Sequence, residues 1–152
     1  MLEWLDTSRL AVWLSESPSI WSLPTVLTLH TTGLALLVGA SWVLDLRLLG
    51  LVRTIPLSAF HWVFRVVTIG LVVNIITGVM LFIKNASTWG HSLPFLVKMS
   101  LVVAGCVTLV PIRAHVLRGS AADGSARVWA IASIFTWSAA VTAGRLLAYL
   151  QV

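Results

Sequence analysis

Four long apolar segments constrain this chain more than any other feature. Each has the length that a helix needs to cross the hydrocarbon core of a bilayer, which is about 20 residues. The composition agrees, because 59% of the residues are hydrophobic and 10% are charged, whereas soluble chains are about a quarter charged. We therefore predict an all-α integral membrane protein with transmembrane helices over residues 22–49, 56–83, 94–117 and 126–149.

Short links join these segments, and short links place successive helices side by side in opposite directions. The links cover residues 50–56, 84–93 and 118–125. We therefore expect an up-down-up-down four-helix bundle that forms a single transmembrane domain over residues 1–152.

The first 17 residues do not have the pattern of a signal peptide. Glu3 and Asp6 stand where such a peptide has a cationic region, and no long apolar core follows. Trp4, Trp13 and the other apolar residues are spread around the helical wheel without a clean stripe. The segment is short and mixes apolar with polar residues, and we interpret it as a helix lying at the membrane surface. Residues 1–17 are therefore predicted to be an interfacial helix.

Positive charges collect at one end of the expected bundle. The cations at this end are Arg47, Arg53, Arg113, Arg118 and Arg127. The cations at the other end are Arg9, Lys84, Lys98 and Arg145. Since links rich in Lys and Arg stay in the cytoplasm, residues 50–56 and 118–125 are predicted to be cytoplasmic, at the inner end. Both termini are then predicted to lie at the outer end, on the opposite side of the membrane.

The four histidines fall near the two ends of the expected helices. A helix rises about 1.5 Å per residue, so His61 lies about 7 Å inside the inner end and His115 lies within about 5 Å of it. His30 lies about 10 Å from the outer start of its helix, and His91 is in a link. Two imidazoles at one depth suit a b-type haem, whose iron takes one nitrogen from each side. We expect His61 and His115 to hold an inner haem and regard His30 and His91 as candidate ligands of an outer one.

Three cations are candidate partners of the haem propionates. Arg65 is one turn after His61 and about 13 Å from the inner end, and Arg145 and Lys98 lie in the outer half. A charge inside the bilayer costs about 2.5 kcal/mol or more, so it usually has a partner or a function. The alternative for Arg145 and Lys98 is that their side chains extend to the membrane interface.

Small residues beside the histidines are candidates for the space that a haem ring needs. Gly33 is one turn after His30 on the same face. The alternative for Gly33 is helix packing through small residues, and a histidine taken alone is also explained by a hydrogen bond between helices. For the inner cations, an Asp45–Arg65 or Asp45–Arg113 ion pair is the alternative without haem.

Three stretches of the sequence carry a family resemblance. They are HTTGLALLVGASWVLDLRLLGL at residues 30–51, TGVMLF at 77–82 and AGRLLAY at 143–149. In these the chain resembles, from about residue 25 to 150, a bacterial family of small four-helix inner-membrane proteins without an established activity. More loosely, it is similar to the four-helix di-haem b-type cytochromes of bacteria, in which paired transmembrane histidines hold two haems that pass electrons between quinol and a partner. The place of His91 in a link departs from that pattern.

Together these features predict a b-type cytochrome of the bacterial inner membrane that carries electrons through one or two bis-histidine haems. Quinone is a further candidate cofactor, with quinol or a redox protein as partner. The chain would then be a quinol-linked oxidoreductase or an electron-transfer subunit, and we expect it to be a homo-oligomer or part of a larger complex. No catalytic acid, base or nucleophile stands out.

Two other functions fit the same helices. One is a haem-free membrane anchor or scaffold for a partner enzyme. The other is a small metal or solute transporter, which the count of three methionines and the lack of a Met- or His-rich tract disfavour. The dispersed cations exclude a nucleic-acid partner, and the lone Cys106 allows no disulfide within the chain.

Overall fold

The computed structural model describes residues 3–51, 54–118 and 123–149. All regular elements in these ranges are helices. Four of them are long and apolar enough to cross a membrane: α3 (Leu23–Leu49), α4 (Val63–Lys84), α6 (Leu93–Arg118) and α7 (Gly124–Tyr149). The predicted all-α class and the four long apolar helices are therefore confirmed. Their ends lie close to the predicted ones, except at the start of α4.

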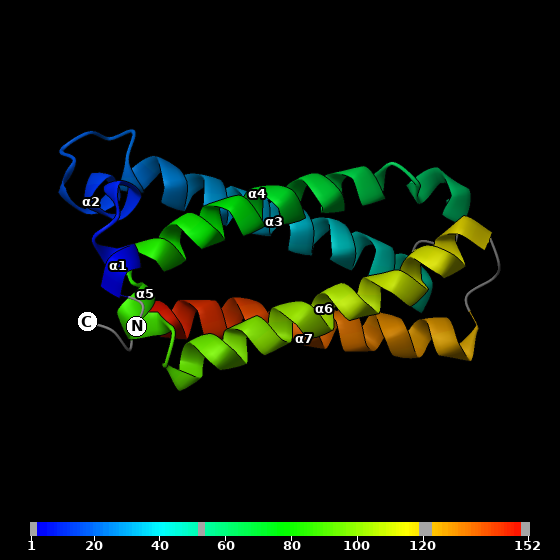
Figure 1. Cartoon of the computed structure of the whole chain (residues 1–152). Coiled ribbons are helices and arrows are strands. Elements are labelled where there is room, and N and C mark those ends of the chain that lie inside the picture. Colours follow the sequence, from blue (N-terminus) through cyan, green and yellow to red (C-terminus); the bar gives the residue numbers. More distant parts are fainter. Residues whose placement is uncertain (1–2, 52–53, 119–122, 150–152) are drawn as a thin grey trace.

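The long helices are arranged as two hairpins. α3 packs along α4, α6 packs along α7, and the hairpins join mainly through α3 and α7. Figure 1 shows the direction of the chain reversing from each long helix to the next. The backbones of α4 and α6 approach each other at few points, so these two helices meet mainly through long side chains such as Phe82 and Phe95.

Short helices gather at one end of the molecule, which we name the terminal end. They are α1 (Glu3–Asp6), α2 (Arg9–Glu16) and α5 (Ala86–Trp89), and the C-terminal part of α7 lies at this end too (Figure 1). The opposite end, named the turn end, holds the end of α6 and the start of α7. The terminal end corresponds to the predicted outer end, and the turn end to the predicted inner one.

The single interfacial helix expected over residues 1–17 is instead two helices. The break falls before α2, where the Ser8 hydroxyl accepts a hydrogen bond from the Ala11 backbone N–H (3.3 Å) and so caps the new helix. Residues of this type favour helix starts because they satisfy free N–H groups. α2 packs on α4, and α1 packs on α5.

Asp6 ties the N-terminal segment to the link that precedes α6. Its Oδ1 accepts a hydrogen bond from the Ala86 backbone N–H (2.7 Å), and the Ser87 hydroxyl donates to Oδ2. These bonds, above all the one from Ser87, hold the pKa of Asp6 below its ordinary value. The predicted link 84–93 contains α5 and is anchored to the N-terminal segment across the terminal end.

The helix expected to run from Pro56 begins differently. A 3-10 helix, η1 (Leu57–Phe60), precedes α4, and the His61 backbone N–H donates to the Ser58 carbonyl (3.4 Å) in the tighter pattern of that helix. α4 starts only at Val63. The depths calculated above for His61 and Arg65 assumed an α-helix from Pro56. The rise per residue differs in the 3-10 segment, so those depths are not exact.

Gly33 and Gly70 bring α3 and α4 into backbone contact. A Cβ atom at Gly70 would lie 2.6 Å from the Leu37 nitrogen and 2.8 Å from the Gly33 carbonyl oxygen, so side chains there would force the helices apart. Across the same contact, the Asn74 side-chain amide donates to the His30 carbonyl (2.9 Å). Gly33 therefore packs against α4. This is the helix-packing role that we gave above as the alternative to making space for a haem.

Asp45 does not form either of the ion pairs considered above. It is fully buried beside Ser133 of α7. Neither carboxylate oxygen has a hydrogen-bond partner within the described part of the chain. The Asp45–Arg65 and Asp45–Arg113 pairs are therefore wrong, and both arginines are left without this counter-ion.

Candidate functional site

Two cavities lie between α4 and α6, one at each end of the molecule. The cavity at the turn end has a volume of about 830 Å³ and contains His61, so we name it the His61 cavity. The cavity at the terminal end has a volume of about 350 Å³ and contains His30, so we name it the His30 cavity. Both cavities form where the backbones of α4 and α6 lie apart.

The His30 cavity has mostly apolar walls. Phe82 of α4 stacks on Phe95 of α6 with ring centroids 5.1 Å apart, and Trp89 of α5 lies 6.1 Å from Phe95. All three rings line the cavity. Its polar lining comes from His30, Asn74 and Lys98. An apolar pocket with a few convergent polar groups is the usual form of a small-molecule site.

The hydrogen bonds of Thr77 favour one tautomer of His30, the one with its proton on Nδ1. The Thr77 hydroxyl donates to the Val73 carbonyl (2.7 Å), so its oxygen is left to accept a hydrogen bond from His30 Nδ1 at 2.9 Å. A neutral imidazole with its proton on Nδ1 carries a lone pair on Nε2. In the described structure no group forms a hydrogen bond to His30 Nε2, which is therefore a free acceptor at the cavity.

Lys98 supplies a hydrogen-bond donor, whereas His30 supplies an acceptor. It is half-buried on α6, and its chain lies over Gly144 of α7, where a Cβ atom would be 3.5 Å from Lys98 Cε. Among the described residues no carboxylate or other acceptor is recorded as a partner of its ammonium group. A cation in such apolar surroundings favours a ligand that brings an oxygen acceptor or a negative charge.

The structure brings only two of the predicted outer residues together. His30 and Lys98 share the cavity, whereas His91 is exposed in the turn before α6 and does not line it. Arg145 is exposed on α7, also outside the cavity lining. Gly33 lies at the contact between α3 and α4.

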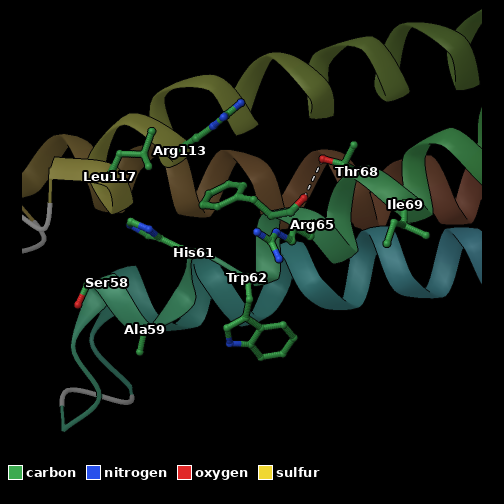
Figure 2. A pocket seen from close by; sticks show the side chains of 10 residues that line it. Ser58, Ala59, His61, Trp62, Arg65, Thr68, Ile69, Arg113 and Leu117 are labelled. Carbon is green, nitrogen blue, oxygen red and sulfur yellow. Dashed lines mark hydrogen bonds between the residues drawn. The ribbon is translucent and has the colours of Figure 1, made fainter.

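At the turn end the structure gathers three basic side chains. His61 and Arg65 line the His61 cavity from the segment of η1 and α4, and Arg113 lines it from α6. In Figure 2 the Arg65 and Arg113 side chains point away from each other. Arg113 entered the sequence analysis only as a topological cation and a possible ion-pair partner, so its place beside His61 is new.

His115 is not part of this cavity lining. Its Nδ1 lies 2.8 Å from the Pro111 carbonyl, one turn back on α6. Its Nε2 lies 3.3 Å from the Ser125 hydroxyl and 3.5 Å from Asp123 Oδ1, at the turn into α7. Both ring nitrogens of His115 are therefore engaged away from His61.

No match was found to this chain among family models, curated proteins or solved structures. The two cavities therefore carry the functional interpretation.

The positions of the four histidines can be compared with what a bis-histidine haem needs. A bis-histidine haem needs an imidazole nitrogen on each side of the iron. In this structure each cavity offers one histidine, and the described residues contain no group of three or more His, Cys, Asp or Glu suited to another metal. The arrangement fits a bis-histidine haem poorly, and the haem sites stay a prediction.

Sequence reasoning missed three residues that shape the His30 cavity. Asn74, Thr77 and Gly78 lie on one face of α4, at spacings of three and four residues. A Cβ atom at Gly78 would be 3.3 Å from His30 Cε1, so the missing side chain makes room for the imidazole. The signal was present, because polar side chains within an apolar span mark functional sites.

Proposed function

We propose that this chain is a multi-pass membrane protein that binds a quinol in the His30 cavity. One observation carries the proposal: His30 Nε2 and the Lys98 ammonium group have no partner among the described residues, and both side chains line the same apolar, ring-walled cavity. Such a site accepts a flat, apolar molecule that has one hydrogen to donate and one oxygen that accepts.

A quinol has this pattern of groups. One hydroxyl donates to His30 Nε2, the second oxygen accepts from Lys98, and the ring lies against the stacked Phe82 and Phe95. The volume of about 350 Å³ is near the lower limit for small-molecule sites, which suits a ring whose apolar tail stays in the bilayer. His30 is then the group in position to accept the hydroxyl proton.

The tautomer of His30 gives this site a preference between the two redox forms. A quinone has no hydroxyl hydrogen, so its carbonyl oxygen would face the lone pair of His30 Nε2. Lys98 serves both forms equally. We therefore expect the reduced form to bind more tightly than the oxidised form near neutral pH.

We place the His30 cavity toward the periplasmic side of a bacterial inner membrane. The support is the distribution of Lys and Arg, since basic links favour the cytoplasm. The turn end has Arg47, Arg113, Arg118 and Arg127. Arg53, also counted at the sequence level, lies outside the described residues.

Quenching of intrinsic tryptophan fluorescence tests the proposal, because Trp89 lines the cavity. A short-chain quinol and the matching quinone are titrated into the purified protein in detergent. Wild type should bind the quinol saturably and more tightly. Lys98→Met should weaken both forms about tenfold or more, since a charge-assisted hydrogen bond contributes on that scale.

Lys84→Met is the matched control, because Lys84 ends α4 outside the cavity lining. It should bind both forms as wild type does. Equal losses in the two lysine variants would contradict a specific role for Lys98.

The second candidate is the b-type cytochrome predicted from the sequence. The observation that favours it is again the His30 tautomer, because iron binds the nitrogen lone pair and a hydrogen bond from the other ring nitrogen orients such ligands. Within the described residues His30 would hold the group, and Lys98 would neutralise a propionate. A bound haem would supply one-electron transfer.

A reduced-minus-oxidised visible spectrum tests this candidate in protein expressed with ample haem. The cytochrome proposal expects a b-type signal that His30→Ala removes and His91→Ala keeps, because His91 does not line the cavity. A wild-type protein without haem would remove the cytochrome and leave the quinol proposal intact.

A further inference from the structure

We infer that the His61 cavity binds the phosphate of an anionic phospholipid. The cavity lies at the turn end, and its volume of about 830 Å³ is more than twice that of the His30 cavity. It is a different site from the proposed quinol site and does not depend on it.

The charges that line this cavity are of one sign. His61 lies just after η1, Arg65 lies in the first turn of α4, and Arg113 lies on α6; all three are labelled in Figure 2. None of the described residues that line the cavity is acidic. In the described structure neither arginine forms an ion pair with a carboxylate, since Asp45 is buried apart and Asp123 lies beside His115.

Two guanidinium groups are well suited to a phosphate. Each presents parallel N–H groups in a planar fork that matches two phosphate oxygens. Arg65 and Arg113 come from different helices and both side chains are exposed, so each can turn toward a phosphate in the cavity. Basic pockets between membrane helices at the cytoplasmic side are a known form of site for lipid head groups.

The rest of the lining favours a lipid over a free phosphate ion. Ile69 of α4 and Leu117 of α6 line the cavity and are 57% and 55% exposed. Trp62, 64% exposed, also lines the cavity, and tryptophan favours the interface between head groups and hydrocarbon. The cavity therefore combines an anion site with exposed apolar walls along which acyl chains can lie.

Native mass spectrometry of the detergent-purified protein tests this inference. Phosphatidylglycerol, phosphatidylcholine and inorganic phosphate are offered separately at equal concentration. Wild type should retain phosphatidylglycerol in preference to the other two. Arg65→Gln/Arg113→Gln should lower its retention about tenfold or more, and each single variant should give an intermediate loss.

Arg127→Gln is the matched control, because Arg127 is exposed at the turn end but does not line the cavity. It removes one positive charge and should leave retention unchanged. Equal retention of the two lipids, or wild-type retention by the double variant and both single variants, would overturn the inference. So would displacement of the lipid by an equal concentration of inorganic phosphate, or a haem that wild type holds and the double variant releases.

Discussion

The Nδ1 atom of His30 lies 2.9 Å from the Thr77 hydroxyl oxygen, whose own proton is donated to the Val73 carbonyl. This link between α3 and α4 favours the proton of a neutral imidazole on Nδ1. It leaves Nε2 as the acceptor at the cavity shared with Lys98. The chemistry proposed for the cavity follows from a residue that does not itself line it.

Thr77→Val therefore removes a positioning group without touching the ligand. We expect quinol affinity to fall by about tenfold or more, the scale on which groups that orient a histidine act. The preference for quinol over quinone should shrink as well, because either ring nitrogen can then carry the proton. Parallel titrations of the two forms measure both effects.

Thr31→Val is the control for this change. Thr31 is next to His30, and its exposed hydroxyl donates to the Leu27 carbonyl in the same local pattern. It should leave binding and preference unchanged, whereas a loss equal to that of Thr77→Val would indicate a general effect on the helices.

Gly70→Ala should destabilise the fold. The added Cβ would meet the Leu37 nitrogen and the Gly33 carbonyl at distances that atoms in proteins do not adopt, and helix backbones cannot move aside as a flexible side chain can. We expect a loss of about 1–3 kcal/mol in unfolding free energy, typical of overpacking. Thermal unfolding in detergent measures it.

Gly39→Ala, on the neighbouring helix α3, is the contrasting variant, since no atom lies within 4 Å of the added Cβ. It should be neutral or stabilising by up to about 1 kcal/mol, because alanine is the better helix former. An equal loss in both variants would contradict the close contact of α3 with α4.

Docking of the N-terminal helices should weaken in acid. The hydrogen bond from Ser87 and the backbone N–H bonds lower the pKa of Asp6 from its ordinary 3.8, so the charged form stabilises the folded contact. This contribution is complete above the unfolded value and is lost as pH falls through the lowered one. Hydrogen-exchange protection of the Ala86 and Ser87 amides should drop there.

Asp6→Asn should make that protection low and nearly independent of pH in the same range. Glu3→Gln makes the same charge change on α1, and the Glu3 side chain forms no hydrogen bond to any of the described residues. It should retain the wild-type pH dependence. If protection of the two amides stays constant in wild type down to about pH 2, Asp6 does not hold α5.

The sequence was sufficient to locate the long helices because hydropathy and length act locally. The sequence also predicted the ends of the bundle at which the histidines lie, since His61 and His30 are near opposite ends in the structure. The start of α4 was missed because a 3-10 turn after Pro56 uses residues that an α-helix also accepts.

The depth of a histidine along its helix does not predict which other histidine it faces. His115 lies near the turn end but engages Pro111 and Ser125. The direction of a side chain depends on the rotation of its helix, which distant contacts such as Gly33 against Gly70 decide. For the same reason the stacking of Phe82 on Phe95 had no sequence signal, whereas Asn74 and Thr77 stood out as polar residues in an apolar span.

The most direct test of the account is quinol binding by His30→Ala, with His91→Ala as the control histidine at the same end. We predict that His30→Ala loses at least about tenfold in quinol affinity and no longer prefers quinol to quinone, while His91→Ala binds as wild type does. Wild-type affinity and preference in a folded His30→Ala protein would contradict the proposal that the His30 Nε2 lone pair receives the quinol hydroxyl.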